Sequence, residues 1–401
     1  FVSFASGMVA LTALFGLGRE LWSPRVGLIA AALLAVAPVF VDQTHDARPE
    51  VMVMAVALAA FYLMLVGERR GSTVLLVIAG LLAGLAVDVH FIGVIAPVSL
   101  LIVLLVRQAS LRTIAWFAIG VALGAVWWLL VHLVPDPALF FEQMRTFSHP
   151  SPLEELQERP LVAIGLGLAR FVRVDAGSVV MLAVASLAAY ELLRRHRDLA
   201  LRTVLTVIAV NVVFLTFAVS HINTAYALFI FPYLALLIAR LLDVIEPARA
   251  RIIAATVVSA ALISVAYMGW RHRDADYSGY IAKLQAGVPS DAVVLGEPSN
   301  WYGFHEQPYL AVPYFNFVGP FGDEVERLGI EYIIADELML EFQLDLESGL
   351  SVNDVEEFLA QEAELVAVVE DAAYGRAQRG GDPPVVTRVY RIGSPGPSDH
   401  P

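Results

Sequence analysis

The chain has 401 residues, of which 58% are hydrophobic, and it carries a net charge of −13 without a single cysteine. The missing cysteine excludes disulfides, thiol catalysis and cysteine-ligated metals, and the acidity argues against a nucleic acid partner. Soluble domains are only about half apolar, so the surplus predicts that part of the chain is covered by lipid.

Charge divides the chain into two parts. Residues 1–270 carry 18 Arg, no Lys and 16 acidic residues, a net charge of +2. Residues 271–401 carry 8 basic and 23 acidic residues, a net charge of −15. We therefore predict a transmembrane body over 1–270, a soluble α/β domain over 271–395 and a disordered tail over 396–401.

Ten apolar stretches of the first part predict a polytopic α-helical membrane bundle, because lipid offers the backbone no hydrogen-bond partner. They cover 1–18, 26–41, 49–66, 73–88, 90–106, 113–134, 176–193, 203–220, 223–240 and 252–270. The chain begins at Phe1, inside the first stretch and without the pattern of a signal peptide. This start predicts that an N-terminal piece is missing.

The distribution of arginine among the loops predicts how the bundle is oriented in the membrane. Of the 18 Arg in residues 1–270, 13 fall in one set of alternate loops and five in the other. The positive-inside rule makes the first set cytoplasmic. The loop 42–48, the segment 135–175, the connection near His221 and the domain after residue 270 are then all predicted outside. Within that segment, Leu161–Val174 is expected to be a helix lying in the membrane interface.

Two further patterns predict packing and secondary structure. Gly80–Gly84 and Gly120–Gly124 are pairs of small residues four apart, which is typical of close helix contacts in membranes. In the soluble part, β-branched runs predict four strands, and a polar-faced segment predicts a helix. The strands are expected at Ala292–Leu295, Tyr332–Ala335, Leu365–Val369 and Val385–Arg391, the helix at Val352–Ala360 and a loop at Gly375–Pro384.

An aromatic loop covers Trp301–Glu306, and Tyr309 and Tyr314 follow it. Aromatic rings suit the faces of sugars or the membrane interface. The loop could therefore bind a sugar, lie at the membrane interface or simply pack against the membrane body. We favour packing against the membrane body.

The most polar part of the predicted bundle is the loop Asp46–Ala47–Arg48–Pro49–Glu50. Pro49 fits the first turn of the next helix, where the helix dipole favours the Glu50 anion. Arg48 can bind a phosphate bidentately, while a carboxylate beside it acts as a base or a metal ligand. A self-neutralised cluster of interfacial charges is the alternative, and both readings stay open.

Other polar residues fall on the same predicted face. His90 follows Asp88 between two apolar runs and can bind a phosphate, ligate a metal or cap a helix. Near His221, Asn223 and Thr224 are possible helix caps, and Pro232 is expected to kink the helix that follows. His132, next to Trp127 and Trp128, fits an aromatic interfacial belt.

The arrangement resembles the GT-C class of integral membrane glycosyltransferases, in particular protein O-mannosyltransferase-like and bacterial lipopolysaccharide-core enzymes. Three stretches carry this resemblance: Leu33–Glu50, with its Asp46–Ala47–Arg48 loop; Gly80–His90, a glycine-rich span ending in His; and Tyr226–Leu237, with Phe231–Pro232–Tyr233. Such enzymes transfer a sugar, with inversion, from a polyprenyl-phosphate carrier to an acceptor outside the membrane.

The resemblance implies roles for particular residues. Asp46 and Glu50 would be the catalytic carboxylates, with a divalent metal ion held by one of them as an open alternative. Arg48 and His90 would bind the carrier phosphate, and His45 and Tyr226 would also contact substrate. Two features of the family are absent from the chain as given, namely the acidic loop after the first span and an Arg where Ala225 stands, so the catalytic base is not assigned.

The leading hypothesis is therefore a multi-pass glycosyltransferase of the plasma membrane with an extracytoplasmic C-terminal domain. Its partners would be a polyprenyl-phosphate-linked sugar, membrane lipid and an extracytoplasmic acceptor, which is a protein, a lipid or an envelope glycan. A transporter or flippase for lipid-linked or envelope precursors is the alternative, although no internal repeat is visible. A non-catalytic membrane protein whose soluble domain binds an envelope polymer is the third reading.

Overall fold

A computed structural model describes residues 2–45, 49–138, 140–141, 165, 171, 175–196, 198–217, 224–297, 300–311, 320–336, 352–371 and 385–393. The chain divides into two compact units, Phe1–Tyr267 and Met268–Pro401, and each is described by itself. Some of the predicted features lie outside the described residues: Asp46, Arg48, His221, Asn223, Tyr314, most of Leu161–Val174, the loop Gly375–Pro384 and the tail 396–401.

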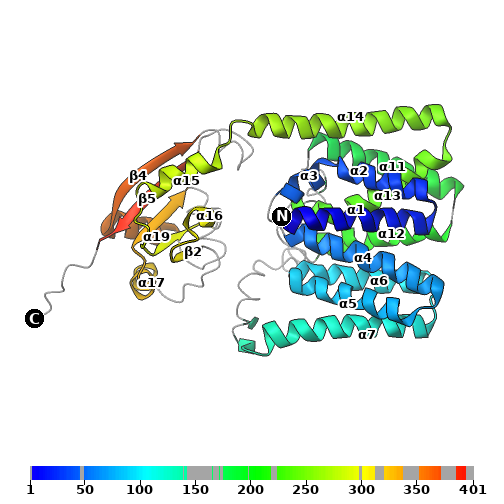
Figure 1. Cartoon of the computed structure of the whole chain (residues 1–401), viewed down its shortest axis with the longest axis horizontal. Helices are drawn as coiled ribbons and strands as arrows, with labels where there is room; N and C mark the ends of the chain where they lie inside the picture. The colour runs from blue at the N-terminus through cyan, green and yellow to red at the C-terminus, as the bar shows by residue number, and fades with distance from the viewer. Residues whose placement is uncertain are drawn as a thin grey trace, which may run out of the picture. The chain divides into compact units, whose positions relative to one another are not determined.

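The first unit is a bundle of apolar helices (Figure 1). In chain order they are α1 (Val2–Leu21), α2 (Pro24–Ala35), α3 (Pro38–His45), α4 (Pro49–Arg70), α5 (Thr73–Val89), η1 (Phe91–Val94), α6 (Ile95–Val106), α7 (Leu111–Trp128), η2 (Leu129–Leu133), α11 (Ala176–Arg195), α12 (Leu199–Phe217), η3 (Thr224–Phe229), α13 (Phe231–Val244) and α14 (Pro247–His272). The chain is thus a multi-pass membrane protein, and the predicted helical membrane bundle is confirmed.

The number of full spans differs from the ten expected. Within the described part of the chain, six helices are long and apolar enough to cross a membrane, and the bent pair α2–α3 makes a seventh. The stretches 73–88 and 90–106 form the shorter apolar helices α5 and η1–α6. The stretch 223–240 is divided between η3 and α13, so Pro232 stands in the first turn of a helix instead of kinking one.

Proline also bends the second predicted span. Pro38 has no backbone N–H to continue α2 and disfavours helical geometry at Ala37. The helix ends at Ala35, and α3 restarts at Pro38 with a bend of 63°. This bend sets the direction of the polar residues at the end of α3.

The close packing predicted at the two glycine pairs is confirmed, and the structure shows that the pairs pack against each other, between α5 and α7. A Cβ atom at Gly80 would overlap the carbonyl oxygen of Phe117 and lie 3.0 Å from the Cα of Gly120. One turn further, a Cβ at Gly84 would lie 3.1 Å from the Cα of Gly124. Only glycine allows the two backbones to come this close, and the resulting dispersion contacts stabilise helix pairs in lipid.

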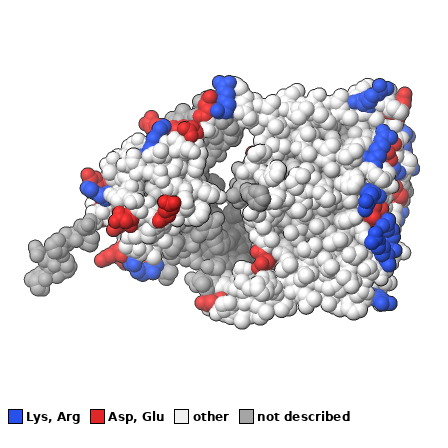
Figure 2. Space-filling view, viewed as in Figure 1, with Lys and Arg blue, Asp and Glu red and all other residues white. Residues whose placement is uncertain are grey.

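Basic side chains gather at one end of the bundle (Figure 2). Arg19 lies in the last turn of α1, and Arg69 and Arg70 lie in the last turn of α4. Some of these arginines tie helix ends together, as in the Arg107–Glu68 pair at 2.7 Å. We call this the arginine end. Of the residues predicted to be functional, His45, Glu50 and His90 lie at helix ends that point the opposite way.

The second unit is a small α/β domain around a five-stranded mixed sheet of order β2-β1-β3-β5-β4. The strands are β1 (Val294–Gly296), β2 (Tyr309–Ala311), β3 (Tyr332–Asp336), β4 (Ala363–Asp371) and β5 (Val385–Ile392), and the helices are α15 (Tyr277–Gln285), α16 (Trp301–Phe304), α17 (Phe321–Leu328) and α19 (Val352–Glu362). The four predicted strands and the predicted helix are present. The sequence did not indicate β2, which pairs with β1 in parallel.

Helices cover both faces of this sheet. Leu295 and Ile333 face a core that contains Phe321 of α17 and Leu359 of α19. Their neighbours in the strands face a second core, built with α15 and α16, because successive side chains of a strand point to opposite faces. The strands β1 and β3 are therefore apolar on both sides.

Candidate functional site

The bundle brings three distant polar motifs to the end opposite the arginine end. His45 ends α3, Glu50 lies in the first turn of α4, and His90 lies between α5 and η1. Tyr226 belongs to η3, which contacts both α3 and α4. Glu50, His90 and Tyr226, one residue from each of the three motifs, thus meet in one place. Asp46 and Arg48 of the polar loop lie outside the described residues.

Glu50 is a buried carboxylate at the start of α4. Its side chain is only 2% exposed. Pro49 begins the helix, and the N-terminal dipole favours a negative charge in the first turn. The carboxylate is close enough to His90 to act electrostatically on its imidazole. Glu50 therefore faces the proposed site instead of serving as a surface charge.

His90 caps a helix and still offers a donor. Its backbone is extended, and its Nδ1 accepts a hydrogen bond from the N–H of Ile92 at 3.2 Å. Since Nδ1 accepts, the proton of the neutral ring is on Nε2. The capping of a helix by His90 is thus confirmed, whereas its phosphate-binding role stays a prediction.

Tyr226 lies against this imidazole. The ring centroids of His90 and Tyr226 are 6.5 Å apart in an edge-on arrangement. On its other side, Tyr226 lies 6.4 Å from the ring of Phe229, at the end of η3. The position of Tyr226 thus depends on how η3 is held in the bundle.

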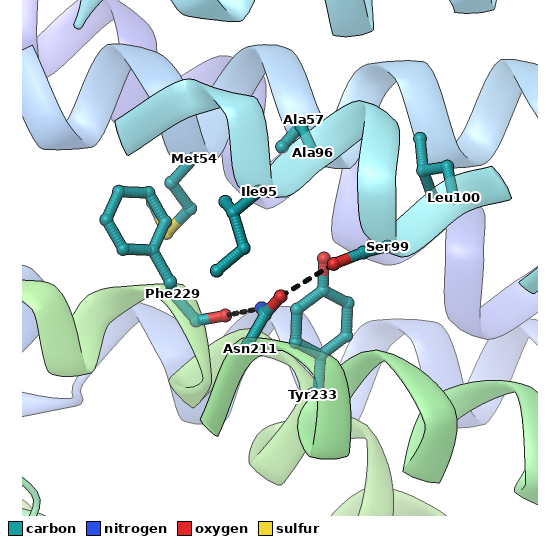
Figure 3. Close-up of a pocket in the computed structure, with 9 residues that line it drawn as sticks. All are labelled: Met54, Ala57, Ile95, Ala96, Ser99, Leu100, Asn211, Phe229 and Tyr233. Atoms are coloured by element: carbon teal, nitrogen blue, oxygen red, sulfur yellow. Dashed lines mark hydrogen bonds between the residues drawn. The ribbon is translucent and has the colours of Figure 1, made fainter. Parts of the chain in front are cut away.

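Asn211 holds η3 in place (Figure 3). Its side-chain nitrogen donates to the carbonyl oxygen of Phe229 at 2.8 Å, and its oxygen accepts from the Ser99 hydroxyl at 2.9 Å. Both side chains are almost fully buried, and Tyr233 lies beside them around a cavity of about 20 Å³. Asn211 was not predicted as a functional residue, although an Asn within an apolar run indicates such an interhelical contact.

The end of α3 supplies two more polar side chains. His45 is exposed, and its Nδ1 lies 2.6 Å from the carbonyl oxygen of Val41. Gln43 is buried at 6% exposure, and its amide nitrogen donates to Asp42 at 3.0 Å. Its amide oxygen has no hydrogen-bond partner among the described residues. Gln43, which was not predicted, is therefore a candidate to contact a polar ligand.

Asp88 and His132 form a separate pair. Nε2 of His132 lies 2.9 Å from a carboxylate oxygen of Asp88, and its ring lies 6.0 Å from that of Trp128. This pair links α5 to η2, and the aromatic surroundings expected for His132 are present. Asp88 thus points toward η2, while His90 contacts η3.

The described residues do not form a metal centre. Among them, no three His, Asp or Glu side chains come together as metal ligands. At the site described above, Glu50 and His90 supply two groups of this kind. Asp46, the other carboxylate considered as a metal ligand, lies outside the described residues, so the divalent metal ion stays a prediction.

An apolar groove begins beside η3. Its volume is about 340 Å³, and it is lined by α11, α12 and the start of α13. Ile230, the residue after η3, is at one end, and Leu234 and Leu237 continue along α13. Of its lining residues only Ser186 is polar. The apolar lining of this groove is suited to a hydrocarbon chain.

Comparisons with known proteins point to one class. The family model described as dolichyl-phosphate-mannose-protein mannosyltransferase matches residues 1–133. No curated protein matches the chain. The structure of ArnT from Cupriavidus metallidurans bound to undecaprenyl phosphate is similar, with a TM-score of 0.60 and 15% identity, over 97% of this chain and 83% of that chain.

Two larger proteins share the fold. The Archaeoglobus fulgidus oligosaccharyltransferase in its apo form has a TM-score of 0.52 and 16% identity, over 89% of this chain and 61% of that chain. The arabinofuranosyltransferase AftD from Mycobacteria has a TM-score of 0.55 and 17% identity, over 97% of this chain and 33% of that chain. The chain thus spans about three fifths of the archaeal protein's length. The expected resemblance is confirmed, and the chain has the GT-C fold.

Proposed function

We propose that this GT-C chain is a glycosyltransferase that moves a sugar from a polyprenyl-phosphate carrier to an acceptor outside the membrane. The convergence of Glu50, His90 and Tyr226 at the end opposite the arginines supports this proposal. The arginine end would be cytoplasmic by the positive-inside rule. The site and the C-terminal domain would then lie on the outer side of the plasma membrane.

Carrier binding would combine charge and hydrocarbon contacts. Arg48 would bind the phosphate bidentately, and His90 would donate from Nε2 to a phosphate oxygen. The isoprenoid chain would lie in the groove of α11, α12 and α13, which starts one residue after η3. In line with this arrangement, the ArnT structure contains undecaprenyl phosphate and an archaeal oligosaccharyltransferase structure contains dolichol-phosphate.

The transfer would be an in-line displacement at the anomeric carbon. The acceptor oxygen forms a bond to this carbon while the bond to the phosphate oxygen breaks, and the anomeric configuration inverts. The acceptor proton passes to a carboxylate, for which Asp46 and Glu50 are the candidates. The leaving polyprenyl phosphate gains negative charge, which Arg48 and His90 stabilise. His45, Tyr226 and Gln43 would position the two substrates.

A transfer assay tests this function. Purified full-length protein would receive radiolabelled polyprenyl-phosphate sugars and a crude envelope acceptor, with and without EDTA. We expect label to move to the acceptor as polyprenyl phosphate is released. Arg48→Ala should abolish transfer, whereas the control Arg25→Ala, at the arginine end, should retain it. EDTA sensitivity would support a metal ion.

Either of two results would contradict the proposal. Normal transfer by Arg48→Ala would show that the assigned site is wrong. Folded protein that moves lipid-linked sugars across vesicle membranes, but transfers none to an acceptor, would favour the flippase reading.

A further inference from the structure

The second unit contains a cleft that the proposed transfer reaction does not use. It has a volume of about 560 Å³ and opens between α15 and α16. Pockets for small ligands commonly measure roughly 300–1,000 Å³. The cleft presents mainly polar and aromatic side chains: Tyr277, Ser278, Gln285, Tyr302, His305 and Glu306. Its size and lining are those of a ligand site.

The walls of the cleft are firmly anchored. Phe304 of α16 is 1% exposed and belongs to the core that contains Ile281 of α15. Between them, Gly303 lies so close to Ile281 that a Cβ atom would overlap that side chain. The Gln285 side chain also donates a hydrogen bond to the carbonyl of Gly303. The short helix α16 is therefore held in place by contacts that do not involve its exposed aromatic residues.

Two aromatic rings are exposed beside this anchored segment. Tyr302 is 58% exposed and Trp301 is 46% exposed, and their centroids are 5.2 Å apart. An exposed ring of this size contributes little to folding, but its negative π-face attracts the slightly positive C–H groups of a sugar ring. The core anchor is Phe304, so Trp301 and Tyr302 are available for a ligand.

The remaining groups can exchange hydrogen bonds with hydroxyl groups. Burial, together with the neighbouring Tyr302, raises the pKa of Tyr277 to about 12, so its phenol remains a donor at neutral pH. Nδ1 of His305 lies 2.7 Å from the carbonyl oxygen of Tyr302, which orients the ring. Ser278 and Gln285 supply both donors and acceptors.

The negative charge of the cleft and its domain limits the class of ligand that the cleft can bind. Glu306 lines the cleft, and residues 271–401 carry a net charge of −15. An anionic ligand would be repelled by this domain, whereas an uncharged polyol would not. We propose that the cleft is a binding site for an uncharged oligosaccharide, which stacks on Tyr302 and exchanges hydrogen bonds with the polar lining. The site lies wholly within the second unit, and its binding does not require the proposed transfer activity.

Binding to defined oligosaccharides tests this site. Full-length protein in detergent would be applied to an array of uncharged and acidic oligosaccharides, and the Kd of the tightest ligand would be measured by titration. We expect an uncharged ligand, and a Kd that rises about tenfold or more in Tyr302→Ala. Tyr302→Phe keeps the ring and should bind nearly as wild type does. Val368→Ala, at an exposed position of β4, is the matched control and should leave the Kd unchanged.

Three results would overturn the proposal: no uncharged oligosaccharide binds, acidic ligands bind more tightly, or Tyr302→Ala binds as wild type does. The thermal transition of each variant shows that the fold is intact. Arg48→Ala distinguishes this site from the transfer site, because it should lose transfer and retain the wild-type Kd. Binding without transfer would thus leave this proposal standing while the proposed function fails.

Discussion

The imidazole of His90 lies edge-on to the phenol of Tyr226, with 6.5 Å between the ring centroids. The two residues belong to the second and third motifs of the sequence analysis, which no local pattern connects. Together with Glu50, the imidazole joins all three motifs in one place.

The two nitrogens of His90 can be tested separately. Asn can replace Nδ1 as the acceptor for the Ile92 N–H, whereas Gln can replace Nε2 as a donor. If Nε2 binds phosphate, His90→Asn should lower the transfer rate by about 10- to 100-fold, the effect of losing a hydrogen bond to a charged group. His90→Gln should retain more activity than His90→Asn. It should lose about 1 kcal/mol of stability, because it removes the acceptor for the Ile92 N–H that caps the helix. Transfer rates and thermal transitions measure both effects, with His196→Asn, at the arginine end, as control. Full activity in His90→Asn would remove His90 from the phosphate site.

Asn211 should stabilise the bundle, because its side chain holds η3 beside the site. Asn211→Leu leaves the Phe229 carbonyl and the Ser99 hydroxyl without this partner, which should cost ~1–2 kcal/mol per lost interhelical hydrogen bond. Ser99→Ala removes only one of these bonds and should have a smaller effect. Thermal unfolding in detergent gives the comparison. Equal transitions in both variants and wild type would show that the bonds do not hold η3.

The glycines at the contact between α5 and α7 should not tolerate replacement by a residue with a side chain. Gly80→Ala places a methyl group against the carbonyl of Phe117, so the helices must separate, at a cost of roughly 1–3 kcal/mol. Gly269 of α14 has no atom within 4 Å of a Cβ at that position. Gly269→Ala is therefore the matched control, and its thermal transition should not fall. An unchanged transition in Gly80→Ala would contradict the close packing.

Filling the apolar groove should affect only donors with long lipid chains. Ala189 lines the groove, whereas Leu187 of the same helix is 64% exposed and does not line it. Ala189→Trp should raise the KM for a long-chain polyprenyl donor and leave the KM for a short-chain analogue unchanged. Leu187→Trp should change neither value. An equal increase for both donors would argue against a lipid chain in this groove.

Tyr277 should make stability depend on alkaline pH. Its pKa is about 12 in the folded protein, compared with an ordinary value of 10.0. Because the folded state holds this proton more tightly, the contribution to stability is complete below pH 10 and is lost as the pH rises toward 12. The thermal transition of Tyr277→Phe should therefore fall less between these pH values than that of wild type. Identical pH dependence in the two proteins would contradict the raised pKa.

Local patterns were sufficient for much of the fold. Hydropathy separated the bundle from the acidic α/β domain, and the alternate arginine-rich loops correspond to the arginine end. The small residues at Gly80 and Gly120 indicated close packing, and β-branched runs indicated four of the five strands. Each of these features depends on residues within one turn, one strand or one span. Local sequence patterns are therefore enough to predict them. The strand β2 was missed because only three residues form it and its partner supplies the pairing.

Only the tertiary structure showed how the motifs of Glu50, His90 and Tyr226 come together. It showed that Nδ1 of His90 caps η1, that Asn211 holds η3 and that the span at Pro38 bends by 63°. It also separated Tyr302, at the cleft, from Phe304, in the core. The physical reason is that composition and periodicity report which face of a segment is apolar. Which side chains touch across the bundle is set by the packing of whole helices, whose approach and register depend on many residues together.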